Sequence, residues 1–249
     1  MNEVLLSARD ITKRFGGLSA VNQVCLDLHQ GAIHAVIGPN GAGKSTLTHL
    51  LSGDIAPSAG TVTLAGQDVT GWRPERISRA GLGRSYQKTN IFLPFTVWEN
   101  VRLAAQSRRQ RAVRWLSLAG GFADTNERAT RALELARLQH RRDAVAGTMS
   151  HGEQRQLEIA MSLATAPRVL LLDEPLAGMG TAEAERMVEL LLRLKAEHAM
   201  MLVEHDMDAV FALADRLTVM VNGQVIASGA PAQVRADPMV QTAYLGEEH

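Results

Sequence analysis

The chain has 249 residues, which is enough for one large domain with a sizeable buried core. Its 26 basic and 26 acidic residues balance, so it lacks the positive surplus usual in nucleic-acid-binding proteins, and we expect no nucleic-acid partner. A single cysteine, Cys25, excludes an internal disulfide framework and favours a reducing compartment. Because Cys25 lies in the apolar segment 21–28, we expect a buried structural thiol.

The first residues show no basic region followed by a long apolar stretch, so we expect no signal peptide. The apolar runs are as short as strands, and none approaches the roughly 20 residues that span a bilayer. The sequence therefore predicts a soluble protein whose association with any membrane would depend on a partner.

Strand-like and helix-like segments alternate along the chain, which predicts an α/β fold. Strands are expected at 5–8, 24–28, 32–37, 61–64, 169–172, 200–203 and 217–221, and helices after Lys44 and at 181–198 and 207–215. The dipeptide Asn222-Gly223 predicts a hairpin that joins 219–221 to 224–226. Residues 96–166 lack strand-like runs and read as helices. We expect one domain over 1–249, with a core at about 1–92 and 167–249 and a helical subdomain at about 93–166.

Residues 38–46 match the phosphate-loop pattern GxxxxGK[ST] between a strand-like run and a helix-like run. Glycines remove side chains that would keep backbone N–H groups away from phosphate oxygens, and the following helix adds its N-terminal dipole. Lys44 would place a positive charge near the β- and γ-phosphates, and the Ser45 hydroxyl would bind Mg²⁺. The residues expected to bind the nucleotide here are Gly38, Asn40, Gly41, Ala42, Gly43, Lys44, Ser45 and Thr46.

The apolar run 169–172 ends in two carboxylates, Asp173 and Glu174. A continuous apolar run is typical of a buried parallel strand, and its carboxyl end opens onto the crevice where α/β sheets bind ligands. Asp173 would therefore bind Mg²⁺, and Glu174 would accept a proton from the attacking water. The alternative is a strand that ends in an ordinary surface turn.

Three further segments narrow the class of phosphate-loop protein. Residues 150–155 resemble the signature motif of ABC-transporter ATPases, residues 86–88 resemble their Q-loop, and residues 202–206 resemble their switch-histidine segment. With the two phosphate motifs they occur in the family's order over about 5–245. The resemblance implies a RecA-like core with an antiparallel β subdomain and an inserted α-helical subdomain.

The resemblance also implies roles for single residues. Two copies would enclose two ATP molecules head to tail, and Ser150 and the Gly152 N–H would contact the γ-phosphate bound to the other copy. Gln87 would touch Mg²⁺ and the attacking water, and His205 would hydrogen-bond the γ-phosphate and orient the water. Phe15 would lie against adenine. Four alternatives stay open: a core aromatic at 15, a surface glutamine at 87, a simple helix N-cap at 150 and a capping or core histidine at 205.

Two segments depart from the common pattern. The signature reads Met-Ser-His-Gly-Glu instead of Leu-Ser-Gly-Gly-Gln, although the Ser and the second Gly that would touch phosphate are present. Gly180 stands where the family usually has an aspartate that helps to link the two sites. We therefore do not assume tight coupling between the sites.

Details at 174–179, 203–207 and 243–247 resemble the ATPases of branched-chain amino-acid importers, and His151 resembles their urea-transporting relatives. The resemblance implies an ATP-hydrolysing importer subunit on the cytoplasmic face of the bacterial inner membrane. Its partners would be a second ATPase subunit, two permeases and, indirectly, a periplasmic solute-binding protein. A lipid or lipopolysaccharide exporter and a soluble ABC ATPase remain alternatives. The basic stretch Arg108–Arg114 is either a solvated helix face or a patch for anionic lipid or a partner.

Overall fold

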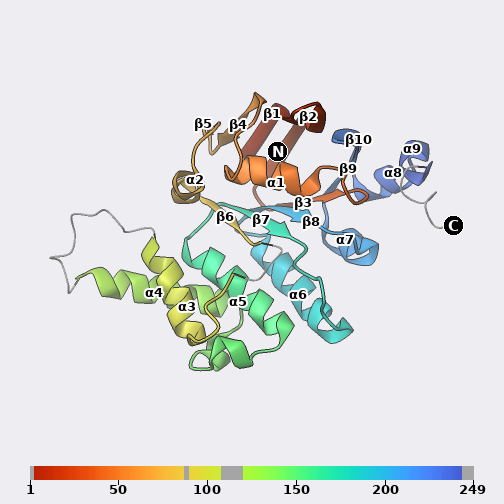
Figure 1. Cartoon of the computed structure of the whole chain (residues 1–249). Helices are drawn as coiled ribbons and strands as arrows, with labels where there is room; N and C mark the ends of the chain where they lie inside the picture. The colour runs from red at the N-terminus through yellow and green to blue at the C-terminus, as the bar shows by residue number, and fades with distance from the viewer. Residues whose placement is uncertain (1–2, 87–89, 108–119, 243–249) are drawn as a thin grey trace.

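The computed structural model describes residues 3–86, 90–107 and 120–242. Two β-sheets enclose one helix between them, and further helices cover the opposite face of the larger sheet (Figure 1). Gln87 and the stretch 108–114 lie outside the described residues. The expected α/β class is confirmed by this mixture of a largely parallel sheet with helices on both faces.

The smaller sheet is antiparallel and contains β1 (Val4–Phe15), β2 (Leu18–His29), β4 (Ala59–Leu64) and β5 (Gln67–Asp68), in the order β2-β1-β4-β5. β1 and β2 each have 12 residues, longer than the apolar runs predicted, because the pairing continues through polar residues on the solvent face. The prediction for Cys25 is wrong, since its side chain is exposed. Val24 and Leu26 point into the core, and strand alternation turns Cys25 outward.

The larger sheet contains β3 (Ala32–Ile37), β6 (Leu82–Arg84), β7 (Val169–Asp173), β8 (Ala199–Val203), β9 (Arg216–Val221) and β10 (Gln224–Gly229). The order is β10-β9-β3-β8-β7-β6, and every pair is parallel except β9 with β10. The predicted hairpin is confirmed, with φ of 48° at Asn222 and 78° at Gly223, as a type I′ turn requires. The short edge strand β6 was not predicted.

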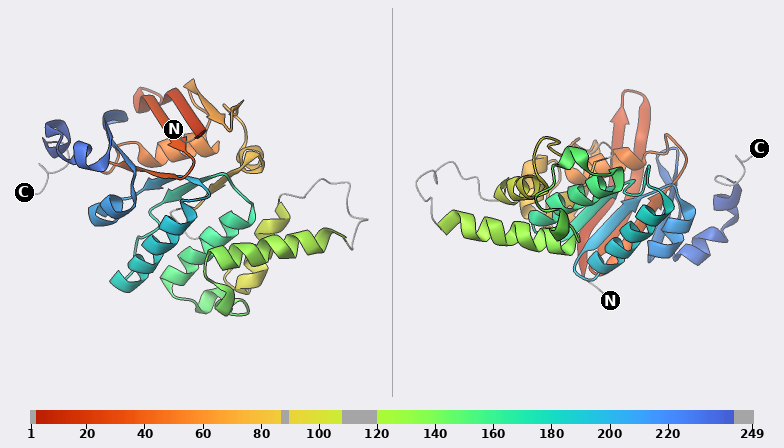
Figure 2. Two further views of the ribbon diagram at one scale, coloured as in Figure 1. Left: turned by 180° about the vertical axis from the view of Figure 1, so that it is seen from behind. Right: turned by 90° about the horizontal axis from the view of Figure 1, so that it is seen from below.

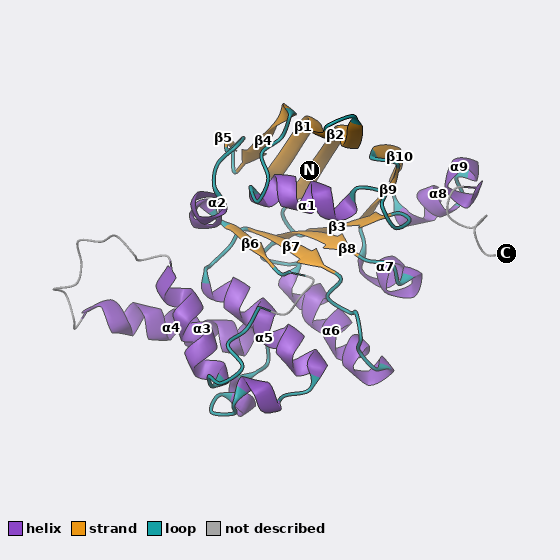
Figure 3. Ribbon diagram, viewed as in Figure 1, coloured by secondary structure: helices purple, strands orange, loops and turns teal. Residues whose placement is uncertain are grey.

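Helix α1 (Lys44–Ser52) lies between the sheets, where Leu47, Leu50 and Leu51 join one buried cluster with both (Figure 3). α3 (Val97–Gln106), α4 (Gly120–Leu135), α5 (His151–Ala164) and α6 (Thr181–Leu194) lie on the other side of the larger sheet (Figure 2). The remaining helices are α2 (Pro74–Ala80), α7 (Met207–Leu213), α8 (Pro231–Arg235) and α9 (Pro238–Val240), with 3₁₀ turns at Gln139–Arg141 and Ala146–Thr148. α6 ends four residues before the predicted boundary at 198.

The topology brings three functional segments to one edge. β8 lies between β3 and β7, and the register pairs Val203 with both Val36 and Asp173. Because parallel strands end at the same edge, the loops after Ile37, Asp173 and Val203 are neighbours there. Among the helices described, none is long and apolar enough to cross a membrane.

Candidate nucleotide-binding site

The phosphate loop follows β3, and its three glycines have positive φ: 152° at Gly38, 80° at Gly41 and 101° at Gly43. A Cβ at Gly38 would lie 2.1 Å from the Met220 carbonyl oxygen, and a Cβ at Gly43 would lie 2.3 Å from the Ala20 carbonyl oxygen. A Cβ at Gly41 would meet nothing within 4 Å. The chain's own backbone therefore requires two of these glycines, whereas Gly41 faces open space.

A cavity of about 470 Å³ lies beside this loop. Every residue from Asn40 to Thr46 lines it, together with Glu174. The start of β2 and the turn between β9 and β10 complete the wall with Leu18, Ser19, Ala20, Asn222 and Gly223. The turn is attached to the loop, because the Gly223 N–H donates to the Ala42 carbonyl over 3.0 Å. The wall is therefore rich in glycines and small side chains, which lets a ligand such as phosphate approach the backbone closely.

Phe15 is three residues before Leu18 in the sequence, but it is not among the residues that line this cavity. Its side chain is 51% exposed, which excludes the core-aromatic alternative. It pairs across the β1–β2 hairpin with Leu18, which does line the cavity. The Lys13 ammonium stands 5.2 Å from the centre of its ring.

Lys44 is the first residue of α1, and its ammonium donates to the carbonyls of Gly38 (2.6 Å) and Pro39 (3.0 Å). Burial lowers the pKa of Lys44, and the nearby carboxylates of Glu174 and Asp173 oppose that shift. The Lys44 ammonium thus lies against the backbone of the phosphate loop itself. The next residue, Ser45, is exposed in the cavity wall.

The carboxylates after β7 have different surroundings. Asp173 is 4% exposed, and burial raises its pKa against the attraction of Arg84, whose guanidinium lies 3.9 Å away. Glu174 is partly exposed in the cavity and has a φ of 48°, an uncommon conformation for a residue with a side chain. Its N–H donates to the Val203 carbonyl over 2.9 Å, which ties it to the end of β8. Strained conformations of this kind concentrate at functional sites.

His205 is exposed, and its Nδ1 lies 3.9 Å from the Glu174 carboxylate. Its position depends on Glu204, which sequence analysis did not single out and which is 1% exposed. The Glu204 carboxylate accepts from the N–H groups of Leu176 (3.0 Å) and His205 (3.2 Å). Burial raises the pKa of Glu204, and these hydrogen bonds oppose the shift. One buried carboxylate therefore holds the segment after Glu174 beside His205.

The signature residues are not part of the cavity wall. Ser150 is the N-cap of α5 and forms a capping box with Glu153, so the N-cap alternative describes a real contact. Its hydroxyl also donates to the Glu183 carboxylate on α6 over 2.7 Å. Gly152 is buried beneath that carboxylate, because a Cβ there would lie 2.7 Å from Glu183 Cδ. The chain thus carries the phosphate loop and the signature at separate places.

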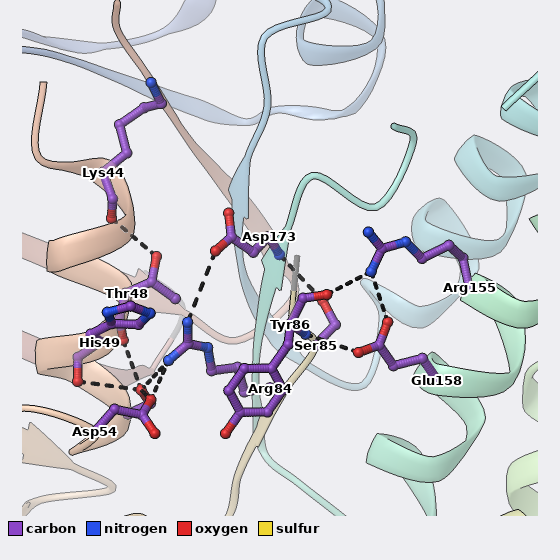
Figure 4. A network of polar contacts seen from close by, with 11 residues as sticks. Lys44, Thr48, His49, Asp54, Arg84, Ser85, Tyr86, Arg155, Glu158 and Asp173 are labelled. Carbon is purple, nitrogen blue, oxygen red and sulfur yellow. Dashed lines mark hydrogen bonds and ion pairs between the residues drawn. The ribbon is translucent and has the colours of Figure 1, made fainter. Parts of the chain in front are cut away.

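A polar network joins α5 to the segment that precedes Gln87 (Figure 4). Arg155 and Glu158 form a buried ion pair of 2.9 Å. Glu158 accepts from the Tyr86 N–H over 3.0 Å and from the Asn90 N–H, and the Arg155 guanidinium donates to the Tyr86 carbonyl over 2.5 Å. Arg84 extends the network to Asp54 and, at 3.9 Å, to Asp173. Sequence analysis gave no role to Arg84, Arg155 or Glu158, because only the fold brings these side chains together.

A second cavity, of about 500 Å³, lies between this network and helix α2. Its wall combines residues of α2 and β6 with residues of α5. It is lined by Ser52, Pro74, Glu75, Ser78, Arg79, Leu82, Gly83, Arg84, Tyr86, Asn90, Ser107, Glu158, Met161, Ser162 and Thr165.

Gly180, where the family usually has an aspartate, is the N-cap of α6, and a Cβ there would meet nothing within 4 Å.

Comparison with known proteins shows which family the chain belongs to. Residues 21–177 match the family model described as ABC transporter. The chain belongs to the ABC transporter family. It is the ATP-binding, ATP-hydrolysing cassette of such a transporter, and its residues 224–249 match a model described as branched-chain amino acid ATP-binding cassette transporter.

Similar proteins cover the full length of the cassette. It is 37% identical over 254 residues to the Escherichia coli high-affinity branched-chain amino acid transport ATP-binding protein LivG, covering 99% of this chain and 100% of that protein. It is 38% identical over 258 residues to BraF of Pseudomonas aeruginosa, a protein of the same description, covering 99% and 100%. A solved nucleotide-free ATP-binding cassette from an ABC transporter superimposes with a TM-score of 0.85 at 31% identity, covering 98% and 100%.

Proposed function

We propose that this cassette powers an importer of branched-chain amino acids or of a related small solute such as urea. The proposal is supported by the full-length similarity to LivG and BraF and by the match of residues 224–249. The single observation that carries the enzymatic part is the separation, on one chain, of the phosphate loop from the signature residues. The phosphate loop and Glu174 line one cavity, and Ser150 with Gly152 begins α5 elsewhere.

We infer a head-to-tail dimer from that separation, in which each ATP lies between the phosphate loop of one subunit and the α5 N-terminus of the other. Helix N-termini bind anions because their first N–H groups are unpaired and their dipole is positive there. Ser150 and Gly152 would thus complete the partner's site. Whether the partner is a second copy or a sister ATPase does not alter this geometry. Gly180 lacks the carboxylate that usually helps to link the two sites, so we do not assume tight coupling between them.

Within the site, catalysis is mostly positioning and charge stabilisation. Lys44 would exchange its bonds to the loop carbonyls for bonds to the β- and γ-phosphates. Glu174 would accept the proton of the attacking water, with His205 holding the γ-phosphate nearby. Gln87 is proposed to contact the same water and Mg²⁺, and Phe15, beside Leu18, is proposed to stack on adenine.

The donor set suits Mg²⁺, which prefers oxygen ligands and keeps several waters. The Ser45 hydroxyl and the Asp173 carboxylate would hold the ion, and a dication would offset the charge of that buried carboxylate. Bound there, Mg²⁺ would neutralise charge on the β- and γ-phosphates.

The cavity of about 500 Å³ is proposed to receive a cytoplasmic segment of a permease. It lies where the core, at about 1–92 and 167–249, meets the proposed helical subdomain, at about 93–166, and the network of Arg155 and Glu158 adjoins it. The cassette would then sit on the cytoplasmic face of the bacterial inner membrane, with a periplasmic binding protein delivering solute on the other side.

The test begins with Glu174→Gln and Lys44→Ala. Glu174→Gln is expected to bind ATP, to abolish turnover and to trap a dimer, while Lys44→Ala loses nucleotide affinity by titration. Near-normal hydrolysis by Glu174→Gln, or unchanged ATP affinity of Lys44→Ala, would refute the roles given to these residues.

The solute is tested by purifying the cassette with its permeases and measuring ATPase stimulation by leucine, valine or urea with the binding protein. Stimulation by lipid instead would favour an exporter.

A further inference from the structure

Glu183 is the third residue of α6, and its side chain makes an unusual connection. A glutamate at this helix position commonly reaches back to the backbone of its own N-cap residue. Here the N-cap is Gly180, and the Glu183 carboxylate instead accepts the Ser150 hydroxyl from the start of α5 over 2.7 Å. The first turn of α6 is thereby attached to the signature.

The same carboxylate covers Gly152. A Cβ at Gly152 would lie 2.7 Å from Glu183 Cδ and 2.9 Å from Oε1, so the absent side chain is what admits the carboxylate. The two segments also lie close together at Gly178, where an added Cβ would lie 3.4 Å from His151 Cε1. The N-terminus of α5 therefore has an anion of the same chain over it, where its dipole and first N–H groups favour negative charge.

A phosphate oxygen and this carboxylate cannot use Ser150 at once. A serine hydroxyl has one hydrogen to donate, and in this conformation Glu183 accepts it. The Ser150 oxygen already accepts the Glu153 N–H over 3.2 Å, which fixes its place at the N-cap. A second anion brought to Gly152 would also be repelled by the carboxylate already there.

We propose that Glu183 is an internal occupant of the signature's phosphate site, which the partner subunit's ATP must displace when the dimer closes. This inference rests on the proposed head-to-tail dimer. Glu183 thereby raises the ATP concentration needed for closure and keeps the two subunits apart at low ATP. It leaves ATP binding to the phosphate loop unaffected, because Glu183 does not line that cavity.

The experiment measures dimer formation by the full chain carrying Glu174→Gln, by sedimentation over a series of Mg-ATP concentrations. Adding Glu183→Ala removes both charge and acceptor, and is expected to lower the half-saturating ATP concentration by about tenfold, the change that loss of one hydrogen bond to a charged group produces. Adding Glu183→Gln keeps an acceptor without the charge and is expected to give a smaller decrease. Glu185→Gln, an exposed glutamate of the same helix, serves as the matched control and should change nothing.

The outcomes separate the inference from the function on which it rests. ATP affinity of the single subunit, measured by titration with Glu174 intact, should be equal in all variants, which a general loss of structure would not allow. If the dimer forms but Glu183→Ala leaves its ATP requirement unchanged or raises it, the occupant role is overturned and the proposed function stands. If ATP binds but no dimer forms at any concentration, the head-to-tail dimer of this chain fails, and the inference fails with it.

Discussion

Replacing Glu158 by alanine should destabilise the protein by about 3–5 kcal/mol, because it leaves the Arg155 charge buried without its carboxylate. The two side chains are 5% and 6% exposed, so water cannot replace the lost partner. The backbone N–H groups of Tyr86 and Asn90 lose their acceptor as well. A loss of this size would remove a large share of the roughly 5–15 kcal/mol by which domains are usually stable.

A double-mutant cycle separates the ion pair from the packing around it. The double variant Arg155→Met/Glu158→Met removes both charges while keeping much of the volume, and is expected to cost clearly less than the sum of Arg155→Met and Glu158→Met measured singly. Part of the loss should remain, because the Tyr86 carbonyl still loses the Arg155 donor. The surplus of the singles over the double is the interaction of the two charges.

The assay is urea unfolding followed by circular dichroism, without nucleotide. Glu185→Ala is the control, since that side chain is exposed and surface changes usually stay within about 0.5 kcal/mol. The reasoning would be refuted if Glu158→Ala lowered the free energy of unfolding by less than about 1 kcal/mol. It would also be refuted if the double variant lost as much stability as both single variants together.

Two further predictions concern stability. Burial lowers the pKa of His34 from 6.5 to about 4, so the unfolded chain binds the proton more tightly and stability is lost as pH falls from 6.5 to 4. The loss should approach about 3 kcal/mol, and His34→Gln should remove that part of the pH dependence in urea titrations at each pH; an unchanged slope would contradict it. Gly43→Ala should destabilise the nucleotide-free protein more than Gly41→Ala. Both glycines have positive φ, but only a Cβ at Gly43 would meet backbone, 2.3 Å from the Ala20 carbonyl oxygen. Equal losses of stability in the same urea assay would contradict this prediction.

Local patterns in the sequence were sufficient for the elements that lie next to one another in the chain. The strand 32–37, the start of α1 at Lys44 and the Asn222-Gly223 hairpin are confirmed by the structure. Each depends on neighbouring residues alone: an apolar run, a glycine-rich turn, or a dipeptide that tolerates positive φ. The family membership follows from the order of such short motifs, and the comparisons confirm it.

Contacts between distant residues were decided by the tertiary structure. Cys25 is exposed because its strand pairs in one register, and the apolar run around it could not reveal which face it takes. Gly38 and Gly43 are required by carbonyls of Met220 and Ala20, which are remote in sequence or on another strand.

The same holds for the charges that surround the proposed chemistry. By itself the sequence determined that the chain has a phosphate loop, two carboxylates after a buried strand and a signature serine. Only the fold decided that Glu204 holds the segment beside His205 and that Glu183 lies on Ser150 and Gly152. The physical reason is that a side chain's partner across 28 or 33 residues depends on how whole helices and strands pack, and a local pattern carries no information on that packing.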